Sequence, residues 1–189
     1  MALSALALCT RALLKIGAQP IASLDEGTAE AEVAANLYAG TRDALLSAHP
    51  WSFATGQAAL PRLAARPTAD FAHAFQLPAD FLRALSAGVP DSGRGLTYRL
   101  LEDRLHCDAA QVVLSYIFRP DESAFPAFFA AVLATRLAAE FCIPLTENTS
   151  RAQMLLAQSD AELRNARRID SQQATPRAFE DFPLISVRG

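Results

Sequence analysis

The chain has 189 residues, of which 51% are hydrophobic and 20% charged, and its formal net charge is −3. This length and hydrophobic content exclude a disordered chain and suffice for one domain, or one domain with an extra lobe. The mild negative charge argues against a dedicated DNA-binding surface, because contacts with phosphates need clustered cations.

Two helices are predicted in the first 50 residues. Leucines recur at helical spacing in residues 2–16, and Gly17 is a natural left-handed stop. A second helix should begin between residues 24 and 29, because Ser23 and Glu26 have the spacing of a capping box. It should run to Ala48, just before a proline.

The helical pattern ends at a corner formed by Pro50, Trp51 and Phe53. Pro50 cannot donate a helical hydrogen bond and pushes the preceding residue towards an extended conformation. Trp51, the only tryptophan, is predicted to be a buried anchor between a helical layer and a sheet. The segment from Trp51 to Phe53 is predicted to be the start of a strand.

Residues 51–119 are predicted to form a β-rich lobe. Polar or small residues alternate with aromatic ones in residues 71–76, and a second strand begins at residue 81. Residues 96–101 and 104–108 should pair as a hairpin about Glu102 and Asp103. The clearest strand covers residues 111–118, which are rich in β-branched and aromatic side chains.

Two helices then follow. The first, from Pro126 to Pro144, is apolar nearly all round and should be buried inside a bundle or against neighbouring subunits. Arg136 and Glu140 form an i,i+4 pair within it, and these charges argue against a membrane span. The last helix should be capped by Thr146 or Asn148 and run to about residue 169, with one seam of mainly small and apolar residues: Ala152, Leu155, Leu156, Ser159, Leu163 and Ala166.

The order of elements predicts an α+β fold. Residues 1–50 and 120–170 form a helical bundle, residues 51–119 form the inserted β-rich lobe, and residues 171–189 form an extended C-terminal tail. The tail carries apolar side chains that need a surface on the chain itself or on a neighbour: Phe179, Phe182, Leu184, Ile185 and Val187.

No motif for catalysis, a cofactor or a metal is present in the sequence. The consecutive residues His106, Cys107 and Asp108 would point to alternate faces of a strand, so we expect no metal site there. The three widely spaced cysteines are typical of free buried thiols in a reducing compartment. A catalytic triad stays open, because its members can come together from distant positions.

Five segments in order carry a resemblance to a known family. The most specific is Arg42-Asp-Ala-Leu-Leu-x-x-His-Pro-Trp-x-Phe-Ala54. The others are Ala12 to Glu26, Phe75 to Arg83, Leu133 to Glu140 with Pro144 to Thr146, and Ala166 to Gln173. Together they resemble the tail tubular protein A family, the head-to-tail adaptors of short-tailed bacteriophages.

The resemblance implies a structural virion protein that is not an enzyme and needs no cofactor. Similar adaptors form a twelve-fold ring between the portal protein and the tail nozzle protein, assembled in the bacterial cytoplasm. Their helical side faces the portal, their β lobe faces the nozzle, and C-terminal tails embrace neighbouring chains. DNA passes through the ring without specific binding, and no membrane is involved.

On this view the candidate subunit or portal interface comprises charged helix residues and the apolar tail: Arg136, Glu140, Arg167, Arg168, Phe179, Phe182, Leu184, Ile185 and Val187. One alternative is another head- or tail-completion protein with a different neighbour. The other is a tail component with a cryptic cell-wall hydrolase activity, in which His49 would be the first residue to test.

Overall fold

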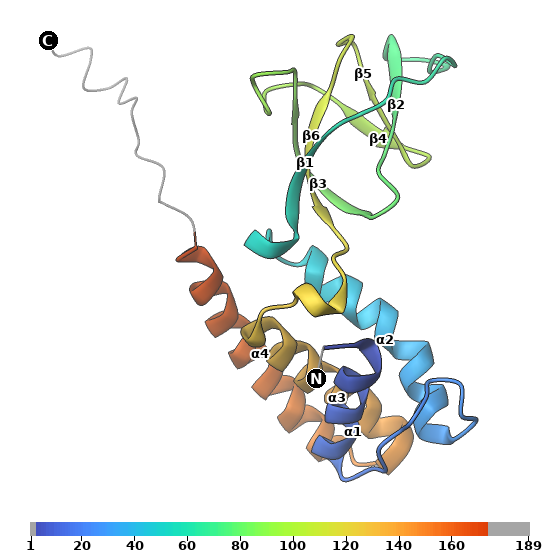
Figure 1. Ribbon diagram of the computed structural model, residues 1–189, viewed down its shortest axis with the longest axis vertical. Coiled ribbons are helices and arrows are strands. Elements are labelled where there is room, and N and C mark those ends of the chain that lie inside the picture. Colours follow the sequence, from blue (N-terminus) through green and yellow to red (C-terminus); the bar gives the residue numbers. More distant parts are fainter. Residues whose placement is uncertain (1–2, 174–189) are drawn as a thin grey trace, which may run out of the picture.

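The computed structural model describes residues 3–173. Four helices and two small antiparallel sheets confirm the α+β class. The helices pack together at one end of the molecule and the strands lie at the other (Figure 1). Of the predicted tail, residues 171–189, the described residues include only 171–173. Ser171 still belongs to the last helix.

Helices α1 (Ala5–Ile16) and α2 (Ala29–Ser47) form the N-terminal part of the bundle. Gly17 ends α1 with a φ of 76°, as its position predicted. The cap of α2 is Thr28, whose hydroxyl accepts a hydrogen bond from the Ala31 amide. The predicted capping box does not cap α2, although its Glu26 half forms. Glu26 accepts hydrogen bonds from the amides of Ser23 and Ala22 in the loop before the helix.

Helix α3 (Ala127–Thr146) is the centre of the bundle and packs against α1, α2 and α4 (Thr149–Ser171). It is long and apolar enough to cross a membrane by length and composition alone, and more than half of its residues are buried within this fold. Pro144 does not end it, contrary to expectation. Proline there removes only one hydrogen bond, and Thr146 completes the last turn.

Helix α4 starts after Asn148, whose side chain accepts the Arg151 amide at 2.9 Å as predicted for a cap. Ala152, Leu155, Ser159 and Ala166 are buried along its seam. Leu156 was expected in this seam but is 39% exposed. The seam therefore covers a narrower face of the helix than its apolar residues predicted.

The lobe contains two three-stranded sheets. Strands β1 (Thr55–Ala59), β6 (Val113–Phe118) and β3 (Phe81–Gly88) form the first, with β6 in the middle. Strands β2 (His73–Gln76), β5 (Arg104–Cys107) and β4 (Arg99–Leu101) form the second. The predicted hairpin is present: Glu102 and Asp103 have φ values of 50° and 58° between paired β4 and β5.

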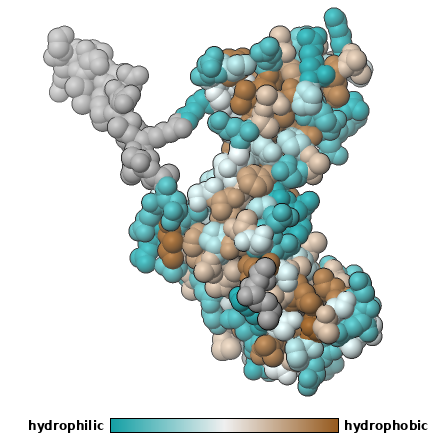
Figure 2. All heavy atoms as spheres, viewed as in Figure 1, coloured by the Kyte–Doolittle hydropathy of each residue, from teal (hydrophilic) through white to brown (hydrophobic). Residues whose placement is uncertain are grey.

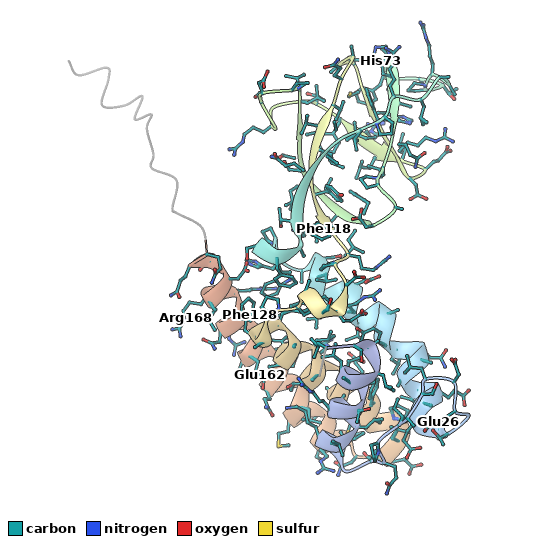
Figure 3. All side chains as sticks on the ribbon, viewed as in Figure 1. Glu26, His73, Phe118, Phe128, Glu162 and Arg168 are labelled. Atoms are coloured by element: carbon teal, nitrogen blue, oxygen red, sulfur yellow. The ribbon has the colours of Figure 1, made fainter. Side chains whose placement is uncertain are left out.

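The bundle and the lobe have separate hydrophobic cores. Phe129, Leu133 and Leu137 of α3 lie in the larger core, whereas Phe75, Leu105 and Leu114 lie in the core between the strands. Figure 3 places Phe128 in the bundle close to the junction and His73 at the far tip of the lobe. Two chain crossings connect these parts, one on each side of the lobe in the sequence.

Candidate interaction site

The first crossing is the predicted Pro50–Trp51–Phe53 corner. Trp51 is fully buried, and its indole Nε1 donates a hydrogen bond to the carbonyl oxygen of Leu45 at 3.0 Å. Its ring contacts the rings of His49 and Phe129 edge-on, with centroids 4.7 and 5.2 Å apart. The prediction of a buried anchor is therefore confirmed.

The predicted strand through this corner is wrong. Residues Ser52–Ala54 form a 3-10 turn, and β1 begins only at Thr55. In this turn the rings of Trp51 and Phe53 lie 6.0 Å apart, and both contact Phe129. Packing of both rings against the helical core favours this turn over a strand. Pro50 itself is exposed.

Asp170, near the end of α4, holds this corner in place. Its carboxylate accepts hydrogen bonds from the Ser52 amide at 3.1 Å and from the Ser52 hydroxyl at 2.7 Å. His49 Nε2 lies 3.5 Å from the same carboxylate. The Asp170 side chain is only 4% exposed. These contacts therefore compensate for the hydration that the carboxylate loses on burial.

Sequence reasoning missed Ser52 and Asp170. One signal was available, because an acidic side chain in the last turn of a helix is unfavourable next to the negative end of the helix dipole. Such a residue usually has a compensating partner. The partner, however, lies 118 positions away, so local patterns could not identify it.

The corner contains the three residue types of a hydrolytic triad, namely His49, Ser52 and Asp170. The order in which their side chains contact one another, however, differs from that of a triad. In a triad the histidine lies between the serine and the acid and accepts the serine proton. Here Asp170 lies in the middle and accepts the hydrogen bonds, and among the described residues no hydrogen bond joins Ser52 to His49. Burial lowers the pKa of His49, opposed by the charge of Asp170. The geometry is that of a structural clamp.

The second crossing, from β6 back to α3, has its own clamp. Arg119 donates two hydrogen bonds to the carboxylate of Asp43 on α2, at 3.1 and 2.7 Å. Arg42 contacts both Asp43 and Glu122, and the Tyr38 hydroxyl donates to Glu122 at 2.9 Å. Partial burial raises the pKa of Asp43, but the hydrogen bonds from Arg119 and Arg42 outweigh it and lower the pKa overall.

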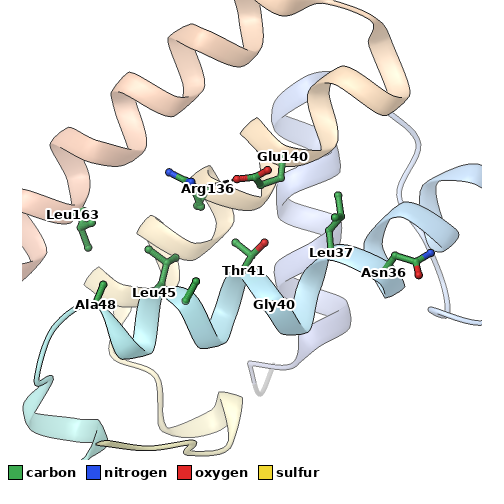
Figure 4. A pocket seen from close by; sticks show the side chains of 10 residues that line it. Asn36, Leu37, Gly40, Thr41, Leu45, Ala48, Arg136, Glu140 and Leu163 are labelled. Carbon is green, nitrogen blue, oxygen red and sulfur yellow. Dashed lines mark hydrogen bonds and ion pairs between the residues drawn. The ribbon is translucent and has the colours of Figure 1, made fainter. Parts of the chain in front are cut away.

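Both predicted charges of α3 lie in a groove between α2 and α4 (Figure 4). Arg136 Nε and Glu140 Oε1 are 3.0 Å apart, and Arg136 also approaches Asp160 of α4 at 3.9 Å. The groove has a volume of about 490 Å³. Its other walls are mainly small or apolar: Asn36, Leu37, Gly40, Thr41, Ala44, Leu45, Ala48 and Leu163.

A second hollow of about 260 Å³ continues the groove along α3 and α4. The two hollows share Arg136 and Glu140, so the ion pair lies between them. Ile143 and Leu156 line the second hollow and are 53% and 39% exposed. We call the two hollows together the α2–α4 groove.

The other predicted interface residues divide into three groups. Arg167 donates a hydrogen bond to the Ala48 carbonyl oxygen at 3.4 Å, next to one end of the α2–α4 groove. Arg168 is exposed outside the groove and contacts Asn165 (Figure 3). The apolar tail residues lie outside the described part of the chain: Phe179, Phe182, Leu184, Ile185 and Val187.

Within residues 3–173 no cluster of three or more histidine, cysteine or acidic side chains could hold a metal ion. Cys9, Cys107 and Cys142 are all buried and free. Burial raises the pKa of Cys9 to about 12, so this thiol stays protonated at neutral pH. These cysteines are therefore packing residues of the described fold.

Neither a scan against protein-family models nor a search of curated proteins found a match to this chain. The functional evidence thus consists of the clamped junction, the α2–α4 groove and the motifs of the sequence.

Proposed function

We propose that this chain is a subunit of an adaptor ring that joins the portal to the tail nozzle of a short-tailed bacteriophage. The observation that carries the proposal is the role of the Arg42–Ala54 segment. This segment bears the most specific family resemblance, and it also supplies residues to both clamps: Asp43 at the second crossing and Ser52 at the first. The motif thus coincides with the junction of the two parts.

A rigid junction suits a protein that must contact a different partner at each end. We expect the carboxylate contacts at both crossings to limit rotation of the lobe on the bundle, so that one end is positioned relative to the other. The proposed arrangement has the bundle towards the portal and the lobe towards the nozzle. The buried Asp170 and the partly buried Asp43 are the residues on which this rigidity depends.

The charge distribution is also compatible with a conduit for DNA. The helical residues 1–50 and 120–171 carry twelve acidic and eight basic side chains, whereas residues 51–119 carry six and seven. Phosphates are repelled by an acidic surface and held by a basic one. If the helical part faces the channel, its acidic excess would let DNA pass without binding it.

The test is to mix the purified protein with the portal protein encoded in the same genome and to measure native mass and electron-microscopy images. The proposal expects a closed ring of many copies on one end of the portal, with the bundle in contact. A matched sample with another oligomeric phage protein of similar charge controls for non-specific binding. No association with the portal, but binding to a different head or tail protein, would overturn the proposal in favour of another completion factor.

The hydrolase alternative has its own measurement. Release of cell-wall fragments by the purified protein, lost on Ser52→Ala and on His49→Ala while the fold is retained, would contradict a purely structural role. Among the described residues, the Ser52 hydroxyl donates to the Asp170 carboxylate and has no hydrogen bond to His49. We therefore expect no such release.

A further inference from the structure

Among residues 3–173, the α2–α4 groove has the form of a helix position that no element fills. Helix α3 packs against α1, α2 and α4, and its remaining side carries Arg136, Glu140 and Ile143 at helical spacing. Figure 4 looks into the groove from this side and shows α1 beyond α3, on the opposite face of the bundle. A helix laid in the groove would therefore contact α2, α3 and α4 together.

The α2 wall of the groove allows a close approach of another backbone. A side-chain carbon added at Gly40 would meet no described atom within 4 Å, so the fold of residues 3–173 does not require glycine there. Glycine inside a helix lowers its stability relative to alanine, and one accepted use of glycine is close approach of a second group. Ala44 and Ala48 continue the same small-residue wall.

The outer face of α1 offers matching groups. Leu14 is 59% exposed and lies between the exposed cations Arg11 and Lys15 on this face. Residues 3–20 contain these two cations and no acidic residue. Figure 2, viewed from the α1 side, shows hydrophobic side chains among hydrophilic ones on this part of the bundle surface.

Acidic groups lie in and beside the groove. Arg136 and Glu140 form an ion pair in its lining, and Asp160 lies beside it, 3.9 Å from Arg136. Glu32 lies in an adjoining hollow that shares Asn36 with the groove. With Arg167 at the Ala48 end, three acidic groups and two cations lie in or beside the groove, so its surroundings carry a small negative excess. The apolar residues Leu37, Leu163 and Ile143 lie between these charges and could cover an inserted leucine.

We propose that α1 of one copy docks in the α2–α4 groove of the next copy, with Leu14 inserted and Arg11 and Lys15 close to the acidic groups. The two surfaces lie on opposite faces of the bundle and differ from each other. Such a head-to-tail contact is heterologous, and it closes into a ring when the rotation between copies allows. This inference rests on the ring of the proposed function but not on the portal.

Site-specific cross-linking tests the contact directly. Leu14→Cys and Ala44→Cys are made as separate proteins, which is feasible because the three native cysteines are buried. Under mild oxidation we expect a disulfide-linked dimer only in the mixture of the two proteins, with or without the portal. The matched control is Met154→Cys, since Met154 is 60% exposed on α4 and does not line the groove.

Three results would overturn the inference. One is a Leu14→Cys homodimer as efficient as the mixed product, because this indicates a symmetric contact. Another is no mixed product at the highest concentration, either alone or with the portal. A third is an Ala44→Cys disulfide to Phe182→Cys in place of Leu14→Cys, which assigns the groove to the C-terminal residues.

Blocking the groove supplies a second readout. Gly40→Leu, which points a large side chain into the open groove, should leave the thermal midpoint of the monomer unlowered while weakening self-association at least about tenfold. Lys15→Glu should weaken it in the same direction through charge repulsion. Rings that form the mixed disulfide but do not bind the portal would contradict the proposed function only. Rings that bind the portal without forming the mixed disulfide would contradict this inference only.

Discussion

The Ser52 hydroxyl lies 2.7 Å from the Asp170 carboxylate, although the two residues are 118 positions apart in the chain. This hydrogen bond joins the last turn of the last helix to the first residue of the turn that leads into the lobe. The same carboxylate also accepts the Ser52 backbone amide. One buried aspartate therefore connects the end of the bundle to the start of the lobe.

Asp170→Ala should lower the free energy of unfolding by about 1–3 kcal/mol, because the Ser52 amide and hydroxyl would lose their acceptor. Urea denaturation followed by tryptophan fluorescence measures this, since Trp51 adjoins the clamp. Asp160→Ala is the control: that side chain is 54% exposed, and its loss should change the free energy by no more than about 0.5 kcal/mol. Equal effects of the two variants would contradict the clamp.

The stability of the protein should depend on His49 as the pH falls. Burial lowers the pKa of His49 below 6.5, although Asp170 opposes this shift. The unfolded chain then binds a proton more readily than the folded one, so the contribution is complete above pH 6.5 and is lost as the pH falls below it. Urea midpoints between about pH 7.5 and pH 5 should show this loss.

The matched variants for this titration are His49→Gln and His73→Gln. His49→Gln should remove the part of the pH dependence just below pH 6.5, whereas His73→Gln should keep it, because His73 lies at the far tip of the lobe. The pKa values of Asp43 and Glu122 are lowered below their ordinary values, so these groups titrate in a more acidic window. An unchanged profile for His49→Gln would show that another group is responsible.

Trp51→Ala should lower the free energy of unfolding by about 3–5 kcal/mol, because the side chain is fully buried and a cavity would remain. Trp51→Phe should cost less, since it keeps most of the ring but loses the hydrogen bond to Leu45. Thermal denaturation followed by circular dichroism compares the two without a tryptophan signal. A similar midpoint for Trp51→Ala and the unmodified protein would contradict the burial described here.

The second clamp should contribute less than the first. Asp43 and Arg119 form a bidentate ion pair, but their side chains are 26% and 39% exposed, so solvent screens the pair. A double-mutant cycle with Asp43→Ala and Arg119→Ala should give a coupling of roughly 0.5–1 kcal/mol. A coupling near zero would leave the orientation of the lobe to Asp170 and to packing.

Two glycines should respond to alanine in opposite directions. Gly40→Ala should stabilise the monomer by about 0.5–1 kcal/mol, because the position is helical and open. Gly88→Ala should destabilise it by about 1–3 kcal/mol, because a side-chain carbon there would collide with the backbone of Ser92 and Arg94. Urea midpoints of both variants decide this, and a loss of stability in Gly40→Ala would contradict the open groove.

Elements with a strong local signal were predictable from the sequence. The apolar repeat of α3, the stop at Gly17, the Asn148 cap and the hairpin at Glu102 and Asp103 all depend on neighbouring residues. The burial of Trp51 followed from its size and its place after a helix-ending proline. These features arise because short-range hydrogen bonding and hydrophobic periodicity act over a few residues.

Other features depend on residues that are distant in the chain. The Ser52–Asp170 clamp, the turn that replaces a strand at Trp51 to Phe53, and the exposure of Leu156 appear only when α4 is packed on α3. In the described part of the chain, the α2–α4 groove likewise exists because α1, α2 and α4 leave one side of α3 uncovered. The sequence by itself determined the types and the order of the elements, whereas tertiary packing decided which polar groups meet and which apolar surfaces stay exposed.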